Sequence, residues 1–332
     1  MTIESIAPET LTRDTTVETT RDVEAERVAL AERLLRSTAD RAYDGDLDID
    51  WDAPIAPDKP WATEMRGTLF GTEIYAALTD DQKLRLSRAE AVAILTYGIN
   101  AEIGLCTNLL RGIFHGKDFA DASTLYSLSE IAEETRHSTM FGRLINKTGM
   151  EPYRRPKALS MPLRLIGFIP HGPVVYAGTL LVEEVLDRVQ RESMADETIQ
   201  PHVRQLMKIH VLEEARHITF ARNELADAID RSGPVSLAIN RLLCAALTLF
   251  VMPTLVDSQA YKSVGIGQLR GWWAAQRSPR YRENASFMCG PMLRYFHEAG
   301  LIKGRVTTAL YRASRALPDD VLQAIRDEER GQ

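Results

Sequence analysis

A five-residue string, Glu-Glu-x-Arg-His, occurs twice in the chain, at residues 133–137 and 213–217. In each copy a glutamate precedes a histidine by three positions, giving the pairs Glu134/His137 and Glu214/His217. Residues three apart lie about 60° apart around a helix axis and one turn along it, so both side chains can reach the same metal ion. A single pair of this kind often arises by chance. Two pairs on separate long helices predict a metal site inside a helical protein.

The remaining pattern supports helices. From residue 79 onward, apolar residues recur with helical spacing in segment after segment, and alternation with a period of two is nearly absent. We therefore expect an all-α protein with almost no sheet. The expected helices cover residues 17–36, 79–113, 123–147, 174–194, 201–230, 235–259, 283–299 and 305–317.

Composition narrows the class of protein. The chain has 332 residues, of which 45% are hydrophobic and 26% are charged, and these proportions are typical of a globular protein. A formal net charge of -6 argues against a nucleic-acid binder, which normally carries a basic patch. The three cysteines are too scattered for a disulfide framework, which favours a reducing, cytoplasmic location. They are Cys106, Cys244 and Cys289.

Two apolar stretches require a test for membrane spans. Prolines interrupt residues 163–181, and residues 235–256 contain Arg241 and Pro253. A span needs roughly 20 predominantly apolar residues, so we expect core helices here and no membrane span. The N-terminus lacks the basic start and apolar run of a signal peptide.

Each of the other two long helices can add one inward carboxylate. Glu102 shares a stripe with Leu95 and Cys106, whereas Glu90 points roughly 120° away from it. In the helix expected at residues 174–194, Glu183 and Glu184 compete for this role. Glu183 lies beside apolar residues. Glu184 shares its face with Arg188 and Arg191, which is typical of a solvated face, so we favour Glu183 and keep Glu184 as the alternative.

His210 stands one turn before Glu214, and His210, Glu214 and His217 fall within an arc of about 60° on an otherwise apolar stripe. Burying several carboxylates together is costly unless cations lie between them. Two divalent ions would neutralise four glutamates. Mixed imidazole and carboxylate ligands suit iron or manganese.

This pattern resembles that of the ferritin-like di-iron proteins. The extra histidine in His210-x-x-x-Glu214-x-x-His217 and the run Thr-Ile-Gln-Pro at residues 198–201 are similar to the p-aminobenzoate N-oxygenase family, whose di-iron site has three histidines. The resemblance covers roughly residues 69–301 and implies a ferritin-like four-helix di-iron bundle with additional flanking helices. It also makes Arg294 a candidate anchor for an acidic group of the substrate, although a surface arginine is the favoured interpretation. The implied metal ligands are Glu102, Glu134, His137, Glu183, His210, Glu214 and His217.

The resemblance implies a non-haem di-iron oxygenase. With two iron ions and O2 as co-substrate, it would oxidise the nitrogen of a small-molecule amine towards a hydroxylamine, nitroso or nitro product in specialised metabolism. Electrons would come from an external reductase or a small reductant, and a homodimer is expected. Three alternatives stay open. They are a di-iron hydroxylase or desaturase acting on carbon, a storage, ferroxidase or redox-sensing protein without an organic substrate, and a manganese-containing site.

The expected domain organisation has three parts. Residues 1–60 form a tail, a peripheral helix and an acidic, Pro-rich linker; residues 61–317 form the ferritin-like di-iron oxygenase domain; residues 318–332 form a C-terminal tail. The acidic run at residues 44–52 is not a calcium loop of the EF-hand type. Ile49 and Ile55 stand where such a loop needs Gly and a bidentate Glu, so a solvated acidic loop is expected.

Overall fold

The structure is a computed structural model and describes residues 15–116, 118–154 and 172–331. Within these residues the chain forms helices joined by loops and turns, with no strand, which confirms the all-α prediction. The first part of the apolar stretch at residues 163–181 lies outside the described residues. The helices are α1 (Thr15–Asp40), α2 (Glu73–Ala76), α3 (Asp80–His115), α4 (Ala122–Thr148), α6 (Pro173–Ala195), α7 (Pro201–Asp230), α8 (Pro234–Thr254), α9 (Gln268–Arg277), α10 (Pro279–Glu298), α11 (Arg305–Ala313) and α12 (Asp319–Gly331), with 3-10 helices η1 (Glu64–Arg66) and η3 (Ser258–Val264).

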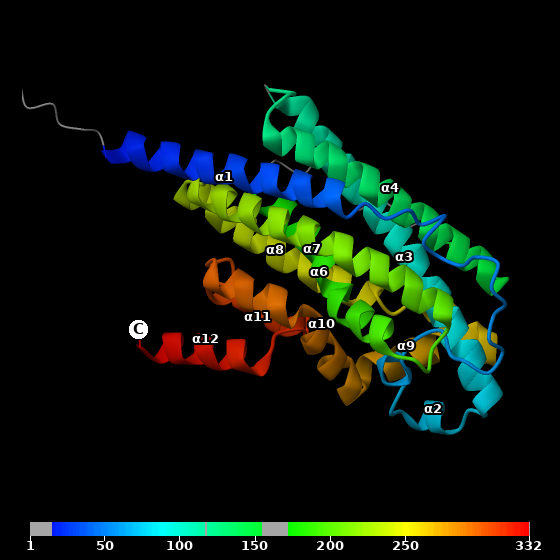
Figure 1. Cartoon of the computed structure of the whole chain (residues 1–332). Coiled ribbons are helices and arrows are strands. Elements are labelled where there is room, and N and C mark those ends of the chain that lie inside the picture. Colours follow the sequence, from blue (N-terminus) through cyan, green and yellow to red (C-terminus); the bar gives the residue numbers. More distant parts are fainter. Residues whose placement is uncertain (1–14, 117, 155–171, 332) are drawn as a thin grey trace, which may run out of the picture.

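Four long helices form the central bundle (Figure 1). Helix α3 packs along α4, and α6 packs along α7. The two pairs join through contacts between α4 and α7 and between α3 and α6. Each bundle helix therefore has one face directed at a shared interior, which is the arrangement that the metal-site prediction requires.

Local sequence signals set the ends of these helices. The Thr79 side chain accepts a hydrogen bond from the Gln82 backbone N–H while the Gln82 side chain caps the Thr79 N–H, forming a capping box at the start of α3. Helix α4 ends at Gly149, whose φ of 70° lies in the left-handed region that favours glycine. Pro201 occupies the first turn of α7, where its missing N–H costs nothing.

Helix α8 differs from the expectation of a core helix. Cys244, Ala245 and Met252 are buried on one of its faces. Val235 and Ile239 are 74% and 54% exposed on the other. By length and composition alone, Asp80–His115 and Pro234–Val264 would both pass as membrane-spanning helices, which is weak evidence because core helices also pass. The absence of a membrane span therefore stays a prediction.

The flanking segments are held to the bundle by specific contacts. Helix α1 packs against α4 and α7, and Arg27 Nε lies 2.6 Å from Glu224 Oε1. The acidic run is anchored rather than fully solvated, because Ile49 is buried in a cluster that includes Leu144. The segment expected as a C-terminal tail forms α12, which packs against α10 through its apolar face.

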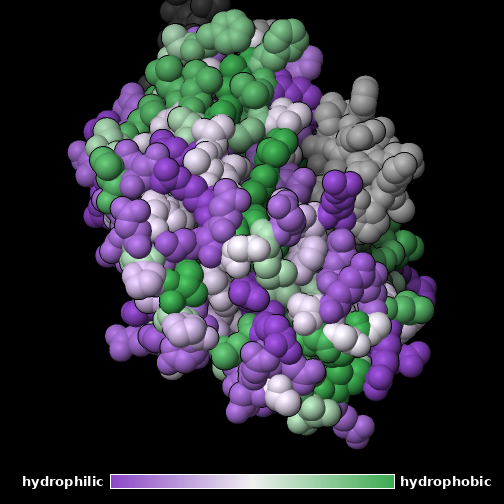
Figure 2. All heavy atoms as spheres, turned by 90° about the vertical axis from the view of Figure 1, so that its right-hand side faces the viewer, coloured by the Kyte–Doolittle hydropathy of each residue, from purple (hydrophilic) through white to green (hydrophobic). Residues whose placement is uncertain are grey.

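Apolar side chains gather at the upper end of the molecule in Figure 2, where Figure 1 has the turn between α3 and α4. The large apolar residues exposed in this region are Leu110, Phe114, Phe119, Leu125 and Leu128. This end of the bundle lies one or more turns beyond the inward-facing glutamates of α3 and α4. It is separate from the site described next.

Candidate metal centre

The structure brings together all seven side chains that the sequence nominates as ligands. Each is 5% exposed or less, and they come from all four bundle helices. Their ligand atoms form two groups, and within each group the atoms lie within 4.8 Å of one another. Glu214 belongs to both groups, so its carboxylate lies between them. The first group is Glu102, His137, His210 and Glu214, and the second is Glu134, Glu183, Glu214 and His217.

The imidazoles turn specific nitrogen atoms towards these carboxylates. Nδ1 of His137 lies 3.2 Å from Glu134 Oε2 and 3.3 Å from Glu214 Oε1. Nδ1 of His217 lies 2.7 Å from Glu134 Oε1. His210 instead presents Nε2, which lies 3.5 Å from Glu102 Oε1. The residues therefore offer three nitrogen donors and four carboxylates to one buried space.

Several of the atoms that face this space have no hydrogen-bond partner. Buried polar atoms nearly always have a partner, because losing one costs about 1–3 kcal/mol each. Two divalent cations would satisfy these donors and neutralise the four carboxylates, so the residues present fit a two-metal centre. Among the described residues, the unpartnered buried atoms of the cluster are Glu102 Oε2, Glu134 Oε1, both carboxylate oxygens of Glu183 and Glu214, and His217 Nδ1.

A second set of contacts holds two of the imidazoles through Nε2, the ring nitrogen on the side away from the metal position. Nε2 of His137 lies 2.8 Å from Glu213 Oε2. Nε2 of His217 lies 2.7 Å from Glu133 Oε2. Each histidine on one helix thus contacts the first glutamate of the repeated string on the other helix. Such contacts fix the ring orientation and leave Nδ1 directed at the metal position.

The arginines of the two strings also donate hydrogen bonds to the outer glutamates of these strings. Arg216 Nη2 donates to Glu133 Oε1 at 2.6 Å, and Arg136 Nη2 donates to Glu213 Oε1 at 3.3 Å. None of these four residues was among those predicted for the site. The signal was present, since both strings repeat the outer glutamate and the arginine as well as the metal-facing pair.

Gln190 supports the third histidine, and sequence reasoning missed it. Its Oε1 lies 2.9 Å from Nδ1 of His210, which leaves Nε2 directed at the carboxylates. Gln190 follows Glu183 by seven positions, so both side chains lie on the same face of α6. An amide two turns after an inward glutamate is the pattern that would have indicated it.

Burial and neighbouring charges set the protonation of the cluster. Burial raises the pKa of Glu102 and Glu183 well above the usual range, and neighbouring carboxylates raise it further. Burial would also raise the pKa of Glu214, but the three histidines around it lower that pKa to about 2. Burial lowers the pKa of His210 to about 4, so this imidazole is neutral and has a lone pair to offer.

Glu184 and Glu90, the two alternative ligand candidates, lie outside the cluster. Glu184 is buried, so its expected solvated face is wrong; Arg222 on α7 pairs with it and covers it. Glu90 accepts a hydrogen bond from the backbone of Thr68 rather than joining the cluster. These contacts favour Glu183 over Glu184, and Glu102 over Glu90, as metal ligands.

The structure does not bring Arg294 to the site. Its side chain is 45% exposed and pairs with Asp320 at the start of α12. Arg294 is absent from the described lining of both cavities near the cluster. The predicted role as anchor for an acidic substrate group therefore has no support in the fold.

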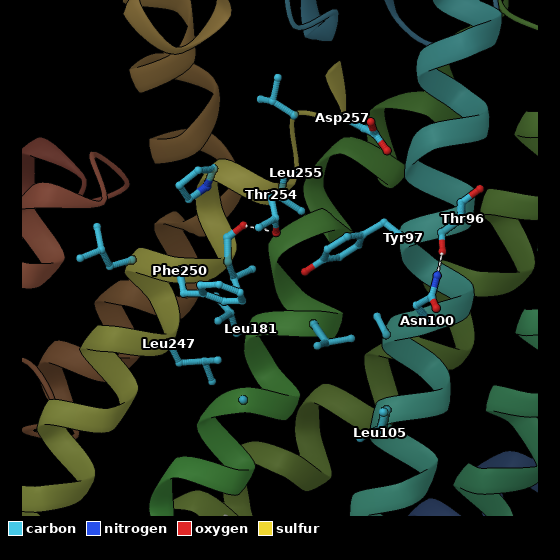
Figure 3. Close-up of a pocket in the computed structure, with 18 of the residues that line it drawn as sticks. Thr96, Tyr97, Asn100, Leu105, Leu181, Leu247, Phe250, Thr254, Leu255 and Asp257 are labelled. Carbon is cyan, nitrogen blue, oxygen red and sulfur yellow. Dashed lines mark hydrogen bonds between the residues drawn. The ribbon is translucent and has the colours of Figure 1, made fainter. Parts of the chain in front are cut away.

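One cavity adjoins the cluster, and a second cavity lies beside the first. The second, here named the outer chamber, has a volume of about 520 Å³ and lies between α3, α6 and α8 (Figure 3). The first, named the inner chamber, has a volume of about 190 Å³ and is lined by Glu102, Glu183 and His210 among others. A molecule in the inner chamber therefore touches three of the nominated ligands.

The fold and the site define a di-metal protein of the helical-bundle type, built from carboxylates and imidazoles. Residues 24–300 match the model of the family described as P-aminobenzoate N-oxygenase AurF. The chain belongs to this family. The resemblance seen in the ligand pattern is thereby confirmed.

Other similarities are more distant. Uncharacterized proteins of Mycobacterium bovis and of two strains of Mycobacterium tuberculosis are 26% identical over 216 residues. The match spans 63% of this chain and 63% of each of those proteins. A solved variant of an R2-like ligand-binding oxidase with a Mn/Fe cofactor has a TM-score of 0.39 and 13% identity, covering 92% of this chain and 99% of that one.

Proposed function

We propose that this protein is a di-iron N-oxygenase, which uses O2 to oxidise the nitrogen of a substrate amine. The observation that carries the proposal is the inner chamber, because it brings a small molecule against Glu102, Glu183 and His210. Family membership and the third histidine support nitrogen rather than carbon as the site of oxidation. Iron is the proposed metal, with manganese as the alternative, and an external reductase or small reductant is the proposed electron donor.

The residues would hold two ions in the two groups described above. Glu102, His137 and His210 would bind one ion, Glu134, Glu183 and His217 the other, and Glu214 would lie between them. When bound, the iron pair supplies electrons and open positions for O2. The first oxidation balances as amine, O2, two electrons and two protons giving hydroxylamine and water. Neutral His210 adds a donor without adding charge, and the apolar walls around the cluster exclude water.

The two chambers favour an organic substrate over metal storage. A storage site needs a path for ions, whereas these cavities have mainly apolar walls, formed by residues such as Leu181, Val182 and Leu255. Apolar walls with a few convergent polar groups are typical of small-molecule sites. Oxidation of carbon in the same chamber remains the rival outcome, which product analysis separates from N-oxygenation.

The test uses iron-loaded, chemically reduced protein mixed with O2 and a panel of primary aromatic amines. Matched hydrocarbons that carry a methyl group in place of the amino group serve as the carbon probes. We expect hydroxylamine or more oxidised nitrogen products from the amines and none from the hydrocarbons. Exclusive hydroxylation of carbon would contradict the proposal.

Two variants connect the product to the site. His210→Ala should reduce the yield of nitrogen product at least tenfold while the protein stays folded. Glu184→Gln lies next to a nominated ligand but outside the cluster, so it should retain the wild-type yield. An unchanged yield in His210→Ala would remove this histidine from the proposed chemistry.

A further inference from the structure

The outer and inner chambers share a wall. The shared residues of α3 stand four positions apart, so they form one stripe along the helix. Val182 of α6 and the segment that follows α8 complete the wall. The residues that line both chambers are Ala93, Tyr97, Ala101, Val182, Leu255, Val256 and Asp257.

Tyr97 is the largest side chain of this shared wall. Figure 3 shows its ring projecting from α3 into the space between α3 and α8, towards Phe250 and Thr254. Its neighbours on the stripe, Ala93 and Ala101, are small. Tyr97 lines both chambers, so its ring lies at the boundary between the outer chamber and the inner one.

The chambers differ in size and in access. Sites for small molecules usually measure about 300–1,000 Å³. The outer chamber, at about 520 Å³, falls in this range, and it borders the surface at Phe250, which is 37% exposed. The inner chamber, at about 190 Å³, is too small for a whole drug-sized molecule and takes only an end group.

The lining of the outer chamber selects for an apolar group. Its walls come from α3, α6 and α8, and apolar side chains predominate in the lining. The amide of Asn100, one of its polar groups, donates one hydrogen bond to the backbone oxygen of Thr96 at 2.6 Å. The apolar lining residues that contact the space from α6 and α8 include Val174, Val175, Leu181, Leu247, Phe250 and Val251.

We infer that the substrate is an amine that carries a large apolar group, bound with that group in the outer chamber. Its amino end alone passes Tyr97 into the inner chamber and reaches the cluster. That the inner end is an amine rests on the proposed function; that the other end is large and apolar rests on the outer chamber. Tyr97 is thus a specificity-determining residue.

The test measures equilibrium binding to the iron-loaded protein without O2, using anilines that carry para n-alkyl chains of increasing length. Each buried CH2 contributes about 0.8 kcal/mol, so the dissociation constant should fall about fourfold for each added CH2 until the chamber is filled. Affinity that does not change along the series would overturn the inference.

Two neighbouring leucines of α8 provide a matched pair. Leu247 lines the outer chamber, whereas Leu243, one turn earlier, is 39% exposed and lies outside the described lining. Leu247→Gln should weaken the dependence of the dissociation constant on chain length, and Leu243→Gln should retain this dependence. Equal effects of the two substitutions would contradict a role for this chamber.

Variants of Tyr97 test its role at the boundary between the two chambers. Tyr97→Ala should admit anilines with bulky groups beside the nitrogen, lowering discrimination against 2,6-diisopropylaniline relative to 4-butylaniline by at least tenfold. Tyr97→Phe keeps the ring and should keep the discrimination. Wild-type discrimination in Tyr97→Ala would overturn the assignment of Tyr97.

Binding and chemistry separate the two proposals. A clear dependence of affinity on chain length combined with oxidation of carbon would leave this inference intact and contradict the proposed N-oxygenation. The opposite outcome would be nitrogen products formed equally well from short and long anilines, with affinities that do not change with chain length. It would support the proposed N-oxygenation and contradict this inference.

Discussion

Nε2 of His217 on α7 lies 2.7 Å from Oε2 of Glu133 on α4. The two residues come from the two copies of the repeated string, and His137 makes the reciprocal contact with Glu213 at 2.8 Å. Because an ionised carboxylate only accepts, Nε2 of each ring carries the proton in this contact, and Nδ1 is the nitrogen that faces the metal position. The repeat therefore specifies the support of the metal centre as well as its ligands.

Removing this support should weaken metal binding. We expect Glu133→Ala to lower the affinity for Fe2+ about 10–100-fold, because the His217 ring loses the acceptor that fixes its orientation. Glu213→Ala should act similarly through His137. The control is Glu224→Ala, which removes another buried glutamate of α7 that pairs with Arg27 outside the cluster. Anaerobic Fe2+ titration measures the effect, and equal affinities in all three variants would contradict the supporting role.

Metal binding should stabilise the fold strongly. An ion that binds the folded chain alone adds about 2.7 kcal/mol when its concentration is a hundred times its dissociation constant. Two such ions should raise the melting temperature by roughly 10 °C for a chain of this size. Differential scanning calorimetry with and without Fe2+ measures the shift. Glu214→Ala should lose most of it, since Glu214 belongs to both ligand groups.

Gly98 should be intolerant of a side chain. A Cβ at this position of α3 would lie 2.8 Å from the ring of Phe141, which itself packs beside His210 with ring centroids 5.0 Å apart. Gly98→Ala should destabilise the protein by about 1–3 kcal/mol and disturb the His210 side of the cluster. Gly142→Ala is the control, because nothing lies within 4 Å of its Cβ position; it should stabilise by about 0.5–1 kcal/mol. Chemical denaturation compares the two, and equal stabilities would contradict the close packing.

Glu90 gives a prediction for pH dependence. Burial raises the pKa of this carboxyl above its usual value of about 4.3. The folded state therefore binds its proton more tightly than the unfolded state does, and stability falls as the pH rises through the raised pKa. Glu90→Gln is neutral at every pH and keeps an acceptor for Thr68. The variant should gain stability relative to the wild type as the pH rises from 4.5 to 7, measured by urea unfolding. A constant difference over this range would contradict the assignment.

The sequence predicted which side chains meet in one buried space, because helix geometry is simple. Three- and four-residue spacings fix which side chains share a helix face. The apolar neighbours of Glu102 and His210 therefore sufficed to predict that both side chains point into the bundle. The structure places both in the cluster. Family membership, the all-α fold and the bundle arrangement agree with the same pattern. The metal-binding role of each residue remains a prediction that metal analysis has to test.

Contacts between helices were beyond the reach of the sequence. Burial of Glu184 depends on Arg222, which lies on another helix and reaches it across the α6–α7 contact. Helical phase alone placed Glu184 beside arginines of its own helix, so a solvated face was expected. The exchange between Glu133 and His217 also depends on how α4 crosses α7. The expected C-terminal tail is helical, because its short apolar stripe finds a partner surface on α10.

The most direct test of the two-metal centre is the number of metal ions bound per chain. Metal-free protein is titrated anaerobically with Fe2+, and bound iron is determined after removal of the excess. The account predicts two ions per chain in the wild type and in Glu184→Gln, and a loss of tight binding in Glu214→Ala. One ion or none in the wild type, or two tightly bound ions in Glu214→Ala, would contradict a di-metal centre built on these residues.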